Sequence, residues 1–332
     1  MKQHIFVAII CLTIELSSCC SVFAQTVTAG AELPLSQSSQ LKTADREMKP
    51  LISVAALAQK MEAGDEICLI EIGNKRKRYD KGHIKGAHFL HWTKDIIDPK
   101  RYNRYNVLEQ ASLEALMSKL GVANDSHIVV YDRFSSRLST RMCWTLKFWG
   151  HDNVQVLDGG FAKWSSSRQP VTDVVPKVEV TNYQVKTTRH ELRVDAQRVE
   201  ELLSSSSGTL IDGRPVKQFT GEESGTVFHT GKQHQNKGHI PGAINIPWKD
   251  NFKKDGTFKS VLELKEMYHQ SGMDSDGPIV TYCNEGLHAA LPWFVASALL
   301  DCENVSIYDD SMAEWANSDR PIQLSVPNRP KE

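Results

Sequence analysis

The residues whose types and spacing indicate chemistry lie between Ile279 and Ala290. A β-branched run there is typical of a buried strand, Cys283 stands just after it, and an apolar run from about Leu287 is typical of a helix. A strand that turns into a helix directs backbone N–H groups into the turn, which makes a concave site for an anion. A thiol in such a turn is expected to have a pKa roughly one to several units below about 8.5. The stretch therefore predicts that Cys283 is a nucleophile, with a buried structural cysteine as the alternative.

The rest of the chain predicts the elements that must position this turn. Short apolar runs alternate with segments of helical periodicity, which indicates a parallel sheet covered by helices, an α/β fold. The expected strands include residues 67–72, 127–132, 154–157 and 209–212. The expected helices include residues 53–61, capped by Ser53, residues 113–120 and residues 141–149.

The order of these elements repeats, which indicates two copies of one α/β unit. Residues 238–243 (GHIPGA) echo residues 82–87 (GHIKGA), and we expect His83 and His239 to hold these turns rather than to react. The separation from Asp132 to Asp158 equals the separation from Cys283 to Asp309. Asp132 therefore occupies in the first copy the position that Cys283 occupies in the second. Only one copy carries a nucleophile, as expected for an enzyme with one site and a supporting half.

These residues resemble those of the rhodanese family of sulfurtransferases, in the tandem form that acts on thiosulfate or 3-mercaptopyruvate. The resemblance covers about residues 50–323 and rests on the two GHIxGA turns, the pair Asp212 and Arg214, the turn at Cys283, and residues 157–160 with Trp164. It implies two tandem rhodanese-like domains, each a parallel sheet flanked by helices. We expect the first at residues 50–170 and the second at residues 190–323, joined by a linker at residues 171–189.

The resemblance also implies a reaction. In this family the cysteine of the second domain accepts a sulfane sulfur, becomes a persulfide and passes the sulfur to cyanide or a thiol, without a metal or an organic cofactor. Cys283 is then the catalytic residue, and its partners are a small anionic sulfur donor and a thiol or cyanide acceptor. The amides of the turn would stabilise both the thiolate and the persulfide. The residues expected to bind substrate through this turn are Asn284, Glu285, Gly286, Leu287 and His288.

An anionic donor also needs a cation. Arg214 follows the strand at residues 209–212, and ligands bind at the carboxyl ends of parallel strands. Its guanidinium could hold a sulfonate or carboxylate with two hydrogen bonds. An ion pair with Asp212 or Glu222 is the alternative. Lys249 is a second candidate, with a solvated lysine as its alternative, and His288 could bind the donor or cap the helix.

The turn departs from the family pattern because residues 284–290 contain no arginine or lysine. Glu285 would add a negative charge where the donor approaches if it points inward, and the sequence leaves its direction open. A Cys-based phosphatase is disfavoured, since it needs an arginine in this turn. A non-catalytic sulfur carrier or partner-binding protein of the cell envelope remains the alternative to the enzyme.

The long polar segment at residues 220–237 is expected to act as a lid beside the site.

The first residues have the features of a targeting segment. Lys2 precedes an apolar core at residues 5–14, and residues 22–24 (VFA) form a small-x-small cleavage site, which predicts a signal peptide at residues 1–24. The apolar core is too short to cross a bilayer, so we expect no integral membrane span. Residues 16–19 (LSSC) also resemble a lipobox, so a lipid anchor on Cys19 competes with soluble export to the periplasm.

Composition limits the remaining partners. The chain has 39 Lys and Arg against 40 Asp and Glu, a formal net charge of −1, which argues against nucleic acid as a partner. Residues 25–49 are polar and lack periodicity, which predicts a flexible leader. The seven cysteines form no C-x-x-C pair, so we expect no metal site.

Overall fold

The computed structural model describes residues 49–98, 106–133, 135–205, 207–227 and 230–325. The predicted signal peptide, Cys19 and the leader up to residue 48 lie outside these residues, so these predictions stay untested. Within the described part of the chain, no helix has the length and apolar character needed to cross a membrane.

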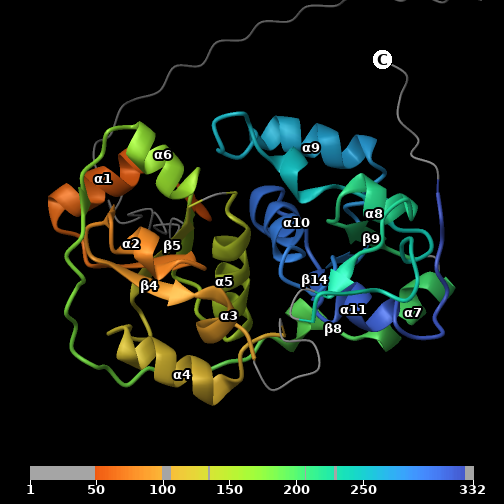
Figure 1. The fold of residues 1–332 in the computed structure, drawn as a ribbon, viewed down its shortest axis with the longest axis horizontal. Coiled ribbons are helices and arrows are strands. Elements are labelled where there is room, and N and C mark those ends of the chain that lie inside the picture. The colour runs from red at the N-terminus through yellow and green to blue at the C-terminus, as the bar shows by residue number, and fades with distance from the viewer. Residues whose placement is uncertain (1–48, 99–105, 134, 206, 228–229, 326–332) are drawn as a thin grey trace, which may run out of the picture. The chain divides into compact units, whose positions relative to one another are not determined.

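The first domain is built on a parallel sheet with the strand order β1-β6-β5-β2-β4, of which Figure 1 labels β4 and β5. The strands are β1 (Leu51–Ile52), β2 (Ile67–Gly73), β4 (Ala87–His91), β5 (His127–Asp132) and β6 (Val154–Leu157). The helices are α1 (Val54–Ala63), α2 (Arg76–Tyr79), α3 (Trp92–Asp95), α4 (Gln110–Lys119), α5 (Arg137–Phe148) and α6 (Gly160–Ser166). A short antiparallel pair joins β3 (His83–Ile84) to β7 (Val171–Thr172) at the start of the linker.

The second domain repeats this plan with the parallel order β12-β9-β13-β14-β8. The strands are β8 (Arg193–Val194), β9 (Thr209–Asp212), β12 (Ile244–Asn245), β13 (Ile279–Tyr282) and β14 (Val305–Tyr308). The helices are α7 (Ala196–Ser205), α8 (Val216–Thr220), α9 (Val261–Gln270), α10 (Ala290–Phe294) and α11 (Ser311–Trp315). The shorter elements are β10 (Thr226–Val227), β11 (Lys232–Gln233), the 3₁₀ turns η1 (His190–Leu192) and η2 (Trp248–Asn251), and the π-helical turn η3 (Val295–Leu299).

Both faces of each sheet are buried, which explains why the strands are apolar without a polar face. In β5, Ile128 and Val130 join one apolar cluster, while Val129 and Tyr131 join another on the opposite face. The second cluster includes residues of α1 and α6. In the second domain the corresponding cluster packs α7 and α11 against the sheet.

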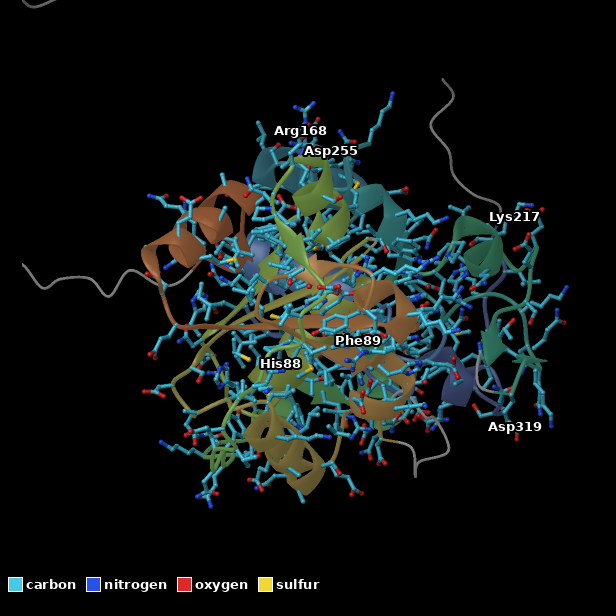
Figure 2. All side chains as sticks on the ribbon, turned by 60° about the vertical axis from the view of Figure 1, so that its left-hand side comes forward. His88, Phe89, Arg168, Lys217, Asp255 and Asp319 are labelled. Carbon is cyan, nitrogen blue, oxygen red and sulfur yellow. The ribbon has the colours of Figure 1, made fainter. Side chains whose placement is uncertain are left out.

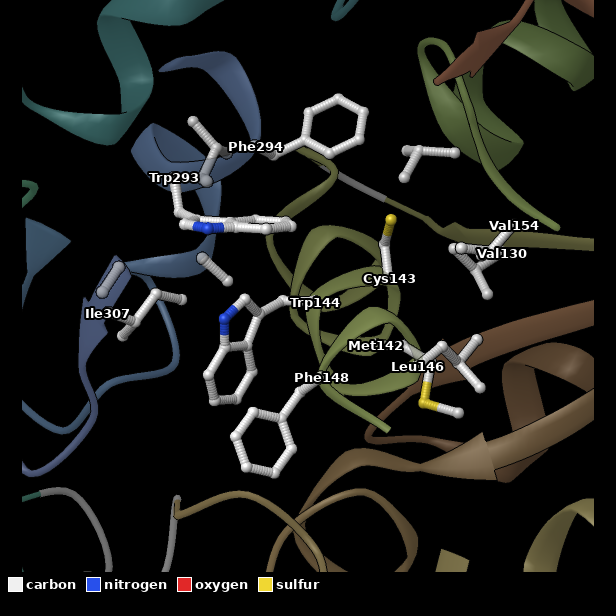
Figure 3. Packing of buried hydrophobic residues seen from close by; sticks show 14 of the residues in the cluster. Val130, Met142, Cys143, Trp144, Leu146, Phe148, Val154, Trp293, Phe294 and Ile307 are labelled. Carbon is white, nitrogen blue, oxygen red and sulfur yellow. The ribbon is translucent and has the colours of Figure 1, made fainter. Parts of the chain in front are cut away.

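One apolar cluster is shared by the two domains. Helices α5 and α10 are in contact, and they bring Trp144 and Phe148 of the first domain together with Trp293 and Phe294 of the second (Figures 1 and 3). All four side chains are almost completely buried. The second α/β unit therefore packs on the first through a continuous apolar core.

The helix boundaries agree with the sequence in part. Ser53 caps α1 as predicted, since its Oγ accepts the Ala56 N–H at 3.2 Å. Helix α5 begins at Arg137, earlier than expected, and α10 begins at Ala290, later than expected. The late start has a local cause, because the residues after Gly286 first wind around Cys283.

Matched contacts confirm the duplication. Trp164 donates its indole N–H to the Pro170 carbonyl at 2.9 Å, and Trp315 donates to the Pro321 carbonyl at 2.8 Å. The histidines of the two turns behave as expected too. His83 stacks on Tyr79 with ring centroids 3.6 Å apart. His239 stacks on Phe219 in the same way at 3.7 Å, so these histidines hold their turns.

Candidate functional site

Cys283 follows the last residue of β13 and lines a pocket of about 470 Å³. Its side chain and backbone are only 2 % exposed, so the thiol lies at the floor of this pocket rather than on the surface. Residues of both domains form the walls. The thiol is therefore buried and still reachable, as a covalent nucleophile must be.

The amide arrangement predicted for the turn is present around this thiol. The backbone N–H groups of Glu285, His288 and Ala289 donate hydrogen bonds to the Cys283 sulfur. The chain can wrap this closely because Gly286 has a φ of +80°, a conformation that favours glycine. A Cβ at Gly286 would also lie 2.3 Å from the Asp309 carbonyl oxygen. Glycine is thus required at position 286 for two reasons: its positive φ, and the lack of space for a Cβ beside the Asp309 carbonyl oxygen.

The expected lowering of the cysteine pKa was wrong. Burial raises the pKa of the Cys283 thiol above its ordinary value, although the amides of Glu285, Ala289 and His288 act in the opposite direction. The sequence predicts the amides but not how deeply the thiol is buried. It therefore could not show that burial has a larger effect on the pKa of Cys283 than the amides have. The thiol is the resting form at neutral pH, and the amide groups become most valuable when charge develops on sulfur.

The base of the turn is tied to α11. The Cys283 N–H donates to the Ser311 hydroxyl at 3.1 Å, and the Cys283 carbonyl accepts the Met312 N–H at 3.1 Å. The Asn284 carbonyl accepts the Ala313 N–H at 2.8 Å. These bonds fix the direction of the turn, so its amides do not need to reorganise when sulfur binds.

The Asn284 side chain is held by a second set of contacts. Its amide nitrogen donates to the Gln218 oxygen at 2.9 Å, and its oxygen lies 3.2 Å from His234 Nε2. His234 Nδ1 lies 3.2 Å from the amide nitrogen of Asn317, a donor, so we assign the histidine proton to Nε2. His234 belongs to the segment predicted as a lid, and Thr226 of the same segment lines the pocket. The segment lies at the site, and its movement stays a prediction.

The first domain holds a carboxylate in the equivalent turn. Asp132 accepts the N–H groups of Ser136 at 3.1 Å, Leu138 at 3.0 Å and Ser139 at 3.2 Å. Asp132 and Cys283 line the same pocket. The corresponding turn in the first domain thus already binds an anion through its amides, which supports the same capacity in the turn around Cys283.

Arg214 does not lie in the pocket, so the prediction that it binds the donor needs correction. The residue is 2 % exposed, and its guanidinium makes an ion pair with Asp212 at 2.6 Å and donates to the Gly238 carbonyl at 2.7 Å. The first domain makes the same clamp with Arg133, which binds Glu71 at 2.7 Å and the Gly82 carbonyl at 2.7 Å. The ion pair with Asp212, the alternative considered from the sequence, is what forms.

Of the other predicted site residues, three line the pocket and one lies outside it. Glu285 is 3 % exposed and lines the pocket, so the outward orientation is excluded. Lys249 does not line this pocket, and its ammonium lies 5.4 Å from the centre of the Trp248 ring in a separate shallow depression. Leu287 and His288 line the pocket of Cys283. The structure therefore brings the turn residues together and leaves both predicted cations outside.

Sequence reasoning missed the wall that the first domain contributes. The residues of this wall include the cations Lys75, Arg78, Arg133 and Arg137 and the aromatic residues Phe89 and Trp92 (Phe89 is labelled in Figure 2). The duplication gave one indication of these cations, because Arg133 and Arg137 lie in the first-domain turn that is equivalent to the turn of Cys283. That indication was not enough, because nothing in the sequence shows that the two equivalent turns share one pocket.

Arg137 makes direct contact with the turn of the second domain. Its Nη1 lies 3.0 Å from His288 Nε2, and its guanidinium lies 4.3 Å from the centre of the Trp248 ring. A guanidinium only donates hydrogen bonds, so His288 accepts through Nε2 and carries its proton on Nδ1. Burial, and then the charge of Arg137, lower the pKa of His288 to about 3. His288 is therefore neutral at physiological pH.

Comparison with known proteins identifies the family. The pattern described as "Rhodanese-like domain" matches residues 53–167 and residues 195–318. The chain belongs to the rhodanese family. The predicted tandem rhodanese fold is therefore confirmed, with two parallel sheets flanked by helices.

The similar rhodanese-family proteins cover most of this chain. A protein of Mycolicibacterium smegmatis named "Putative thiosulfate sulfurtransferase" is 33 % identical over 256 residues, 77 % of this chain and 91 % of that protein. "Sulfur carrier protein TtuD" of Thermus thermophilus is 32 % identical over 255 residues, 76 % of this chain and 88 % of that protein. By name and fold, the chain is related to sulfurtransferases.

Solved structures share the fold at lower identity. The anaerobic ergothioneine biosynthesis enzyme from Chlorobium limicola superposes with a TM-score of 0.73 at 22 % identity, covering 85 % of this chain and 72 % of that one. An EanB variant with ergothioneine covalently linked to a persulfide cysteine gives a TM-score of 0.74 at 23 % identity, covering 84 % and 71 %. At these identities the similarity supports the rhodanese fold alone.

Proposed function

We propose that this rhodanese is a sulfurtransferase that carries a sulfane sulfur as a persulfide on Cys283. The observation that carries the proposal is the position of the Cys283 sulfur, at the floor of a two-domain pocket and hydrogen-bonded to three backbone amides. The related proteins named as thiosulfate sulfurtransferases support thiosulfate or a related anion as the donor.

The reaction that fits this geometry transfers one sulfur atom without net oxidation. The Cys283 thiolate attacks the sulfane sulfur of thiosulfate, the S–S bond of the donor breaks, and sulfite leaves with the bonding electron pair. An acceptor thiolate or cyanide then attacks the outer sulfur of the persulfide and releases the Cys283 thiolate. The amides of Glu285, His288 and Ala289 would stabilise the negative charge on sulfur in both steps.

Intact-mass analysis after incubation with thiosulfate tests this directly. We expect one added sulfur atom on the wild-type protein, its loss on addition of cyanide, and no addition to Cys283→Ser. Cys302→Ala is the control, because Cys302 is a partly buried free thiol that does not line the pocket. Unchanged loading of Cys283→Ser would show that the reactive sulfur lies elsewhere.

A sulfur carrier is the second candidate, favoured by the similarity to the carrier protein TtuD. A carrier would load Cys283 and keep the persulfide until a protein partner removes it. Steady-state thiocyanate production separates the two candidates. Repeated turnover with thiosulfate and cyanide supports the enzyme, while a single loading without turnover supports the carrier.

A further inference from the structure

The proposed reaction needs a positive charge that the catalytic turn does not contain. Residues 284–290 include no arginine or lysine, Arg214 is paired with Asp212, and Lys249 lies outside the pocket. Glu285 instead adds a carboxylate to the pocket lining. An anionic donor must therefore be attracted by the opposite wall, which belongs to the first domain.

Arg137 is a cation of that wall, and it contacts the catalytic turn. Arg133, by contrast, is held by Glu71 and the Gly82 carbonyl. Arg137 donates to His288, and the His288 amide in turn donates to the Cys283 sulfur. The guanidinium is thus linked to the reacting sulfur through a single residue.

The surroundings hold Arg137 in place without neutralising it through an ion pair. Its Nε donates to the Ser135 hydroxyl at 3.1 Å, and its flat face lies on Trp248. Among the residues that the structure describes, no carboxylate forms an ion pair with it. Asp132 is near enough to raise the pKa of Arg137, but burial has the larger effect and lowers that pKa. A guanidinium placed in this way gains from binding an anion.

We infer that Arg137 recognises the oxyanion of the sulfur donor, so that the domain without a nucleophile selects the substrate for the domain with one. This inference rests on the proposed function. The shared chemistry is an oxyanion, either the sulfonate of thiosulfate or the carboxylate of an organic persulfide. Phe89, Trp92 and Leu138, which line the same pocket as Arg137, would accommodate the carbon atoms of an organic donor, for which the pocket volume of about 470 Å³ is sufficient.

An organic persulfide would react by the same balanced step. The Cys283 thiolate attacks the outer sulfur of R–S–SH, the S–S bond breaks, and R–S⁻ leaves and takes up a proton. Cys283 keeps the outer sulfur and its hydrogen as the new persulfide. Arg137 forms no bond in this step, and it holds the distant oxyanion of the donor. It therefore determines donor affinity rather than the rate of sulfur transfer.

The test compares donors with and without an oxyanion. The probes are thiosulfate, freshly prepared N-acetylcysteine persulfide, and the persulfide of N-acetylcysteine amide, which lacks the carboxylate. Single-turnover loading of Cys283 is followed by intact mass as donor concentration varies. In Arg137→Met we expect the half-saturating concentration of an oxyanion donor to rise about 10- to 100-fold, with the maximal rate nearly unchanged. Arg137→Lys should recover part of the affinity.

The amide donor and a second variant supply the controls. The amide should load wild type and Arg137→Met equally, and Arg198→Met, on the exposed face of α7, should behave as wild type with every donor. If Arg137→Met lost the same affinity for all three donors, Arg137 would act only on the structure of the site. Unchanged donor affinities in Arg137→Met would also overturn the inference.

The donors also separate the two sources of the oxyanion. A loss confined to thiosulfate identifies a sulfonate site, and a loss confined to the carboxylate persulfide identifies an organic donor. A preference of the wild-type protein for the carboxylate over the amide tests the same point without any variant. If no donor loads the wild-type protein, the proposed function itself fails.

Discussion

The Cys283 thiol is subject to two opposing influences. Burial at the pocket floor disfavours the thiolate, while the N–H groups of Glu285, His288 and Ala289 stabilise it. The balance leaves the pKa of the thiol above its ordinary value. A resting thiol is less exposed to oxidation than a resting thiolate, which matters if the chain is exported as its first residues predict. The amides would then act mainly on the charged states of the reaction.

This balance predicts the pH dependence of Cys283 reactivity. Below its pKa the thiolate fraction of a thiol increases tenfold with each pH unit, and a raised pKa extends this range upward. We expect the iodoacetamide alkylation rate of Cys283, followed by peptide mass spectrometry, to rise about tenfold per unit from pH 6 to pH 8. Free cysteine, with a pKa of about 8.5, is the reference. A plateau below pH 7 would mean that the amides outweigh burial.

At the scale of elements, the catalytic turn depends on the passage from β13 into α10. The turn is anchored to the start of α11 through the Ser311 hydroxyl and the Met312 N–H. It also passes so close to the end of β14 that only glycine fits at position 286. Helix α10 begins three residues after Leu287 because the backbone is first used to surround the sulfur. Pro292 then lies in the first turn of this helix, where a missing N–H costs little.

Gly286→Ala tests this dependence. The new Cβ would meet the Asp309 carbonyl oxygen, and the φ of +80° is unfavourable for alanine. Gly256→Ala is the matched control, because its φ is +83° and no atom lies within 4 Å of the position that its new methyl group would take. We expect the control to lose about 1 kcal/mol of unfolding free energy and Gly286→Ala at least about 3 kcal/mol. Urea unfolding measures both losses.

The same pair of variants distinguishes the turn from the fold. Gly286→Ala should also lose sulfur loading on Cys283, because the amides can no longer surround the sulfur, whereas Gly256→Ala should load normally. Equal stability losses in the two variants would show that the contact with Asp309 is relieved without cost.

At the scale of the whole molecule, a buried ion pair joins the domains beside the catalytic turn. Arg141 of α5 contacts Asp309 at 2.6 Å, and both side chains are fully buried. The Asp309 carboxylate also accepts the Val107 N–H at 2.8 Å. Arg141 lies 3.4 Å from the Gly286 carbonyl, so the first domain contacts the catalytic turn here as well. Together with the shared apolar core, this contact makes the pocket a property of both domains.

Removal of one partner should be costly. Arg141→Met leaves the Asp309 carboxylate buried without this cation, so we expect a loss of about 3–5 kcal/mol in the free energy of unfolding. The exposed pair of Arg198 and Glu201 is the control, and Arg198→Met should change stability by less than about 1 kcal/mol. Urea unfolding followed by tryptophan fluorescence checks both values. A small loss in Arg141→Met would show that the ion pair contributes little beyond the apolar contact.

The sequence by itself determined the elements and their duplication. Apolar periodicity, the spacing of the GHIxGA turns and the matched tryptophans are local properties, and local sterics and burial decide them. For the same reason the sequence located Cys283 and the amides around it. It also allowed the ion pair of Arg214 with Asp212, but spacing alone could not decide between this pair and a contact with the donor.

Only the tertiary structure decided how the two copies meet. The shared pocket, the contact of Arg137 with His288 and the ion pair of Arg141 with Asp309 join residues more than a hundred positions apart. The pKa of Cys283 belongs to the same group, because desolvation depends on every atom packed around the sulfur, including those of distant segments. Local spacing contains no information about such distances, whereas the packing of α5 on α10 determines them.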